Sequence, residues 1–191
     1  MTTRKPRARR VEPIPASEPI PAVILAIDPG THAGYCVTLR GVYESSGNVK
    51  RGGEAVPVEA AAHLADREGL PLLVVAEKWT PGGRFSGLRT MISLGAAWGR
   101  WEGALLAALV PVSRVVRVYP ATWRAYVGIR PGTRREAIDE HVSAYARAYA
   151  GEAMATDDEA DAVCIAAWAA TSALVRGKVP QRRRKLPPRA E

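Results

Sequence analysis

Two short runs of apolar residues, each followed by a single acid, most strongly constrain how this chain can fold. Residues 23–27 precede Asp28, and residues 72–76 precede Glu77. Apolar runs of this length are too short for buried helices and are typical of strands that are covered on both faces. If the two strands are neighbours, Asp28 and Glu77 lie at one edge of a sheet.

A helix near the end of the chain supplies two more acids. Thr156 followed by Glu159 fits the capping box, which predicts that a helix begins there. Asp158 and Asp161 then share a face in its first two turns. Two strand ends and one helix face can therefore bring four carboxylates together. Acids at such close range repel unless cations hold them, and these oxygen ligands suit Mg2+ or Mn2+.

Structural explanations compete with this one. Acids in the first turn of a helix, such as Asp158, complement the helix dipole by about 0.3–1 kcal/mol each. Glu77 could pair with Lys78 or with an arginine. Asp161 lies deeper, among apolar residues, where the dipole explains less. The joint arrangement favours function, because buried charges without partners are costly.

The remaining pattern predicts an α/β fold. Strands are expected over residues 23–28, 34–39, 41–45, 72–76 and 113–119, and helices over 56–68, 86–109, 133–150 and 156–176. A meander of three strands followed by alternating helices and strands indicates a mixed five-stranded sheet with helices on both faces. A second capping box, from Thr133 to Glu136, is expected to start the helix at 133.

The net charge of +8 is concentrated near the two ends of the chain. Residues 1–22 carry five Lys and Arg and two acids, and residues 176–191 carry seven and one, whereas residues 23–175 hold 15 and 16. We therefore expect one folded domain over 23–176, between a flexible, Pro-rich basic arm (1–22) and a flexible basic tail (177–191). Basic arms favour a nucleic-acid partner over a role in solubility alone.

Other features exclude several classes of protein. The sequence has no apolar run of about 18 residues, so we expect no transmembrane helix. The first residues lack the apolar core of a signal peptide. Cys36 and Cys164 form no metal or disulfide pattern and are expected to be buried free thiols in a reducing compartment, which indicates a cytoplasmic protein.

Four segments in order resemble the motifs of RuvC-type Holliday junction resolvases. They are Ala26-Ile27-Asp28-Pro29-Gly30, Val75-Ala76-Glu77, Leu94-Gly95-Ala96-Ala97-Trp98-Gly99 and Asp158-Glu159-Ala160-Asp161-Ala162. Members of this family have a ribonuclease H-like fold and act as homodimers that nick four-way DNA junctions symmetrically, using Mg2+. The resemblance covers residues 23–175 and implies a crossover junction endodeoxyribonuclease.

The resemblance implies that Asp28, Glu77, Asp158 and Asp161 are the catalytic carboxylates and the ligands of two metal ions. Asp157 is a rival of Asp158, because it is four residues from Asp161.

Basic residues are implied to contact phosphate. Arg124, and one of Arg134 and Arg135, stand where the family has lysines. Arg134 and Arg135 have the wrong sign for the start of a helix, where a bound phosphate would explain them. The equally plausible alternative is a solvated pair near Glu136 and Asp139.

The Gly-rich loop after Glu77 could enter the open centre of a junction. Trp79, Arg84 and Phe85 are its candidate DNA-binding residues. Trp79 is nearest to the aromatic wedge that the family implies; it is also well placed to belong to the core, and the DNA role is slightly favoured.

Gly95, Gly99 and Gly103 recur every four residues in the predicted helix 86–109. Glycine in a helix interior costs roughly 1 kcal/mol, so close approach of another backbone is expected. That backbone could be the sheet or the same helix of a second subunit, and the resemblance favours a homodimer.

Three other functions compete with junction resolution. One is a related nuclease that cuts other branched DNA or RNA/DNA hybrids, and another is a junction-binding module without chemistry. The segment from Asp28 to Thr31 also resembles the phosphate loop of actin-like ATPases, but those proteins have two large lobes and this chain is short for them.

Overall fold

The computed structural model describes residues 20–30, 32–78, 87–110, 115–152 and 154–179. The strands in these ranges are β1 (Val23–Asp28), β2 (Ala33–Leu39), β3 (Val42–Val49), β4 (Leu72–Glu77) and β5 (Val115–Val118). The helices are α1 (Ala55–Arg67), α2 (Leu88–Ala107), α3 (Pro120–Tyr126), α4 (Arg135–Ala150), α5 (Asp157–Thr171) and α6 (Ala173–Arg176).

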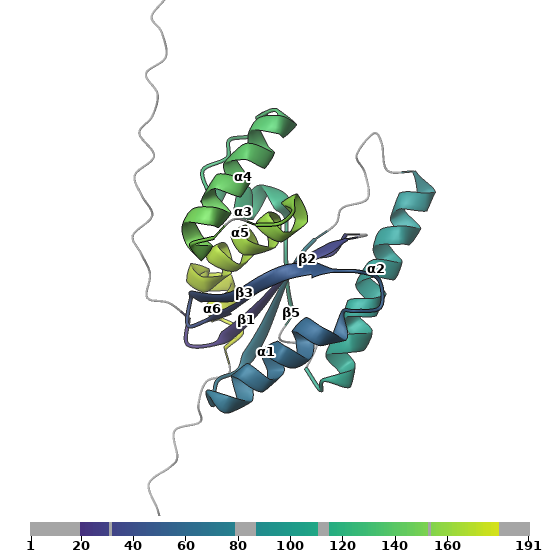
Figure 1. The fold of residues 1–191 in the computed structure, drawn as a ribbon, viewed down its shortest axis with the longest axis vertical. Helices are drawn as coiled ribbons and strands as arrows, with labels where there is room; N and C mark the ends of the chain where they lie inside the picture. Colours follow the sequence, from purple (N-terminus) through teal and green to yellow (C-terminus); the bar gives the residue numbers. More distant parts are fainter. Residues whose placement is uncertain (1–19, 31, 79–86, 111–114, 153, 180–191) are drawn as a thin grey trace, which may run out of the picture.

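The strands form one mixed sheet in the order β3-β2-β1-β4-β5. β1 pairs with β2 antiparallel and with β4 parallel, β3 is antiparallel to β2, and β5 is parallel to β4. Helices α1 and α2 cover one face, while α3, α4 and α5 lie on the other (Figure 1). The predicted five-stranded mixed sheet with helices on both faces is confirmed.

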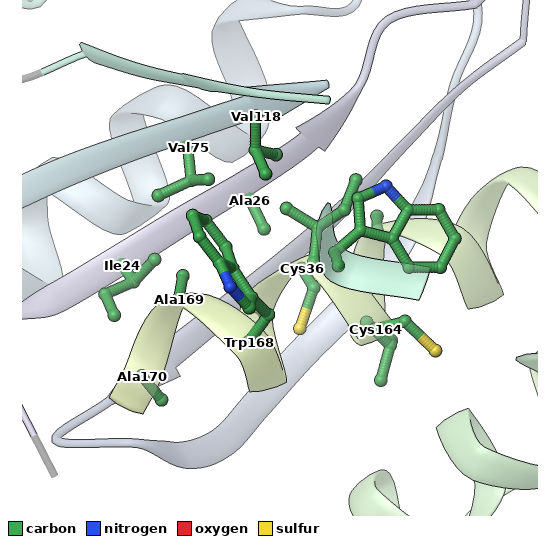
Figure 2. Close-up of a cluster of buried hydrophobic side chains, with 14 of the residues drawn as sticks. Ile24, Ala26, Cys36, Val75, Val118, Cys164, Trp168, Ala169 and Ala170 are labelled. Atoms are coloured by element: carbon green, nitrogen blue, oxygen red, sulfur yellow. The ribbon is translucent and has the colours of Figure 1, made fainter. Parts of the chain in front are cut away.

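The central strands are apolar throughout because both of their faces are covered. Successive side chains of a strand point to opposite faces. In β1, Ile24 packs in the core beneath α5, whereas Val23 and Leu25 pack in the core beneath α1 and α2. Figure 2 shows Trp168 and Ala169 of α5 beside Ile24 and Val75 of the sheet. The core on this face therefore fixes α5 against β1 and β4.

The first turn of α5 lies directly against the backbone of β2. A Cβ atom built on Gly34 would come within 1.9 Å of the carbonyl oxygen of Asp158, so only glycine fits there. Gly34 is the pairing partner of Asp28 in the sheet. This contact therefore brings the acidic start of α5 to the end of β1.

The capping predictions met different outcomes. Thr156 caps α5, and its side chain accepts a hydrogen bond from the backbone N–H of Glu159 at 3.2 Å, as expected. The predicted capping box from Thr133 to Glu136 is wrong. The N-cap residue of α4 is Arg134, which makes no side-chain capping bond. The Thr133 hydroxyl instead donates to the backbone carbonyl of Arg130 at 2.7 Å. A turn that satisfies the hydroxyl locally removes the reason for capping.

Several element boundaries also differ from the predictions. The seven-residue helix α3 was not predicted; its Pro120 occupies the first turn, where proline is well tolerated. The expected helix 156–176 is interrupted at Ser172, whose backbone is extended. β3 continues to Val49 instead of ending near 45, because its polar residues lie on an exposed edge strand. Cys36 and Cys164 are buried free thiols, as predicted.

The glycines of α2 face open space. A Cβ on Gly95, Gly99 or Gly103 would meet no atom within 4 Å among the described residues. The alternative that these glycines admit the sheet beneath α2 is therefore wrong. Across the part of the chain that the structure describes, no helix has the length and apolar character needed to cross a membrane.

We predict that Gly34→Ala destabilises the fold by about 1–3 kcal/mol or more, because the added methyl forces α5 away from β2. Urea denaturation measures the change. Gly177→Ala is the control: its backbone is helical and its methyl would make only ordinary contacts, so stability should change by less than about 1 kcal/mol. Equal stability of the Gly34→Ala protein and the wild type would contradict the close contact.

Candidate functional site

The four predicted carboxylates converge at one edge of the sheet. Asp28 and Glu77 end the parallel neighbours β1 and β4, whose register pairs Ile27 with Ala76. Asp158 and Asp161 come from the first two turns of α5. Asp28 is in electrostatic contact with Glu77, Asp161 and Asp158.

Burial and mutual repulsion make these acids hard to ionise together. The pKa of Asp28 is raised well above its usual value, first by burial and then by the negative charges of Glu77, Asp161 and Asp158. The pKa of Asp161 is raised to about 7, chiefly by burial and by Glu77, while Arg124 opposes the rise. The cluster therefore carries an excess of negative charge that the protein compensates only in part.

Glu77 is held by a tryptophan from the helix that sequence reasoning missed. The indole N–H of Trp123, in α3, donates to Glu77 Oε2 at 2.8 Å. Burial raises the pKa of Glu77, while this hydrogen bond and the charge of Arg124 lower it. Trp123 is fully buried. The available signal was that a buried indole N–H needs an acceptor.

Two basic residues near Glu77 have different partners. Arg124 Nη2 lies 3.8 Å from Asp161 Oδ2, so the arginine expected to contact phosphate contacts a predicted metal ligand in this structure. Its Nε is buried and has no hydrogen-bond partner among the described residues. The Lys78 amine donates to the Tyr119 hydroxyl at 2.8 Å, so the pairing of Glu77 with Lys78 is wrong.

Asp158 is better placed than its rival Asp157. Asp158 is partly buried and adds to the repulsion felt by Asp28 and Asp161. Asp157 is exposed, and its negative charge raises the pKa of Asp158. Burial raises that pKa, and the nearby His32 and Arg135 oppose the rise. His32 therefore lies at the rim of the cluster.

The donor set suits hard divalent cations. Among the described residues, no three His, Cys, Asp or Glu side chains are already arranged as a closed metal cage. Asp28 is nevertheless within electrostatic reach of the other three carboxylates, and Arg124 forms an ion pair with one of them, Asp161. Clustered carboxylate oxygens are the ligands that Mg2+ prefers, and two such ions would offset the uncompensated charge. The residues present therefore fit these ions in their chemistry.

The remaining predicted DNA-binding residues lie at the start of α4 or outside the described structure. Arg134 caps α4 and is exposed. The side chain of Arg135 is 90% exposed and lies 3.7 Å from Asp139, as the solvated-pair alternative expected, while its charge also reaches Asp158. The loop residues Trp79, Arg84 and Phe85 lie outside the described residues.

The sheet order and the helices on both of its faces define a ribonuclease H-like α/β fold. Two solved structures share it with this chain. One is Thermus thermophilus RuvC in complex with a Holliday junction substrate, with a TM-score of 0.56, 22% identity and coverage of 78% of this chain and 93% of that one. The other is Thermus thermophilus RuvC, with a TM-score of 0.56, 23% identity and coverage of 82% and 98%. No family model and no curated protein sequence matches the chain.

The likeness to these structures establishes a RuvC-like ribonuclease H fold, as the sequence motifs predicted. It extends over nearly the full length of each RuvC chain.

We predict that the metal-free protein loses stability as the pH rises from about 4 to about 7. The pKa of Asp161 is 3.8 in an ordinary setting and about 7 in the fold, so the folded state binds a proton that the unfolded chain has released. Mg2+ should therefore raise the melting temperature more at pH 8 than at pH 5. Calorimetry measures both effects, and an unchanged melting temperature with Mg2+ at pH 8 would refute the prediction.

Proposed function

We propose that this chain is a metal-dependent endonuclease that resolves four-way DNA junctions by nicking phosphodiesters symmetrically. The observation that carries the proposal is the cluster of Asp28, Glu77, Asp158 and Asp161 at the end of β1, β4 and α5 in a RuvC-like fold. One of the structures that share this fold is bound to a Holliday junction. The basic arms at 1–22 and 177–191 would add sequence-independent attraction to DNA.

Asp28, Glu77, Asp158 and Asp161 would hold two Mg2+ ions. When bound, such ions activate a water molecule and stabilise the leaving oxygen of the phosphodiester. Asp28 ends a buried strand, so the rigid sheet fixes its carboxylate. Trp123 orients Glu77 through the indole hydrogen bond. Arg124, which lies near Asp161, would turn its guanidinium towards a phosphate that enters the cluster.

The competing functions differ in substrate or in chemistry. Cleavage assays with labelled four-way junctions, flaps and RNA/DNA hybrids, run in competition, separate a junction resolvase from a related nuclease. A binding module without chemistry would bind the junction and leave it intact in the presence of Mg2+. Binding of ATP would instead favour the phosphate-loop alternative at residues 28–31.

We predict that Asp28→Asn or Glu77→Gln abolishes cleavage, by on the order of a thousandfold or more, because each removes a charged metal ligand from the catalytic set. Junction affinity should stay within a few-fold of the wild type, since phosphate contacts dominate binding. Gel assays with and without Mg2+ measure both. The control is Asp66→Asn, an exposed acid in α1, which should cut normally. Full cleavage in excess EDTA would contradict the mechanism.

The exposed face of α2 supports a homodimer. Large apolar side chains near its two ends are mostly exposed: Leu88 by 71%, Ile92 by 62% and Leu106 by 60%. Between them Gly95, Ala96, Gly99 and Gly103 lie on the same exposed side. A symmetric junction needs two active sites, and a two-fold contact through this face would supply them.

We predict that Gly99→Glu converts the dimer to a monomer, because the carboxylate would be buried in the centre of the two-fold contact. The side chain clashes with nothing in the described subunit, and glutamate is a better helix former than glycine, so the monomer should fold. Sedimentation analysis measures the assembly. Ser93→Glu, on an exposed flank of the same helix, is the control. A wild-type chain that is already monomeric would contradict this interface.

A further inference from the structure

A groove leads from the carboxylate cluster towards α2. It has a volume of about 320 Å³, and its lining includes Glu77 of the cluster and Pro29, which follows Asp28. Its walls include Lys78, Trp98 and Arg117. The groove thus opens onto two of the strands that carry the acids, and it is lined by two cations and an aromatic ring.

Among the residues that the structure describes, no carboxylate pairs with Lys78. Its amine donates to the Tyr119 hydroxyl at 2.8 Å and lies 4.6 Å from the centre of that ring. Its backbone N–H donates to the carbonyl of Val118, which ties it to β5. Its positive charge is therefore oriented but not neutralised.

Arg117 is fixed by stacking more than by charge pairing. Its guanidinium carbon lies 3.2 Å from the centre of the Trp98 ring, whereas its Nη2 is 3.9 Å from the Glu102 carboxylate. Glu102 also accepts a hydrogen bond from the Trp98 indole. One third of the Arg117 side chain stays exposed. A planar, stacked guanidinium that is partly exposed is well suited to bind phosphate.

A second hollow, of about 420 Å³, lies on the α3 side of the cluster and is lined by Tyr119, Arg124 and Arg130. Tyr119 lies between the two hollows, because it lines this one and holds Lys78 of the other. The carboxylates are therefore flanked by cations on both sides. Without these flanking cations, the carboxylates would repel the phosphates of a DNA strand on both sides of the cluster.

We propose that the groove between β4, β5 and α2 holds the DNA strand beside the scissile phosphate, with Lys78 and Arg117 contacting a neighbouring phosphate. This subsite rests on the proposed nuclease function. It adds that the cleaved DNA strand would contact cations on both sides of the carboxylate cluster. Trp98 supports Arg117, since the guanidinium covers one face of its ring.

The test combines charge removal in the protein with charge removal in the DNA. Lys78→Gln and Arg117→Gln should each weaken junction binding about 3–10-fold in EDTA and lower the salt slope by about one, as expected for a lost phosphate contact. A single methylphosphonate within two nucleotides of the cleaved bond should weaken wild-type binding, weaken each single variant less, and leave the Lys78→Gln, Arg117→Gln double variant unaffected. Lys78→Arg should restore most of the affinity.

Two further variants separate recognition from structure. Glu102→Gln removes the carboxylate that competes for Arg117, so it should leave binding unchanged or tighten it; weaker binding would mean that the cluster is merely structural. Arg67→Gln, which removes an exposed charge at the end of α1, should not alter binding.

Unchanged affinity in both groove variants, or a methylphosphonate penalty of the wild-type size in the double variant, would overturn the subsite. The nuclease proposal has a separate readout, since it fails if the wild-type chain binds the junction and does not cut it with Mg2+. A junction that the wild type does not bind would overturn both.

Discussion

The contact between α5 and β2 at Gly34 is the constraint on which the rest of the structure depends. Eleven residues of α5 are buried, and they cover the central strands on one side. Small side chains let this helix lie close to the sheet, and the missing Cβ at position 34 lets its first turn touch β2. Because Gly34 pairs with Asp28, the packing that builds the core also delivers Asp158 and Asp161 to the acidic end of β1.

The burial that stabilises the core also makes the carboxylates of the site harder to ionise. Apolar burial holds the elements together, but the same burial removes water from Asp28 and Asp161 and raises the pKa of each. The nearby Arg124 offsets part of the negative charge, and the Trp123 indole stabilises one ionised carboxylate. The cluster thus keeps negative charge that the protein does not neutralise and that bound divalent cations would neutralise. This uncompensated charge favours a metal-dependent function over a purely structural role.

Sequence patterns could predict the parts of the site that are encoded locally. The runs ending in Asp28 and Glu77 specify both a strand and the position of its acid, and the Thr156 cap fixes the phase of α5. The hydrogen bond from Trp123 to Glu77 joins residues that are 46 positions apart and depends on how α3 packs. A seven-residue helix is too short to show a periodicity, and Pro120 within it resembles a break.

The same distinction explains why the groove had no signature in the sequence. Lys78 and Arg117 come from the ends of different strands and become neighbours only through the parallel pairing of β4 and β5. Trp98 reaches Arg117 from α2, the helix whose outer face is apolar. Helix α2 would then have two roles. Its inner side would support Arg117 in the DNA-binding groove, and its outer side would contact a second subunit. A dimer would then have one DNA-binding groove on each side of the two packed α2 helices, and symmetric cleavage of a junction requires two such sites.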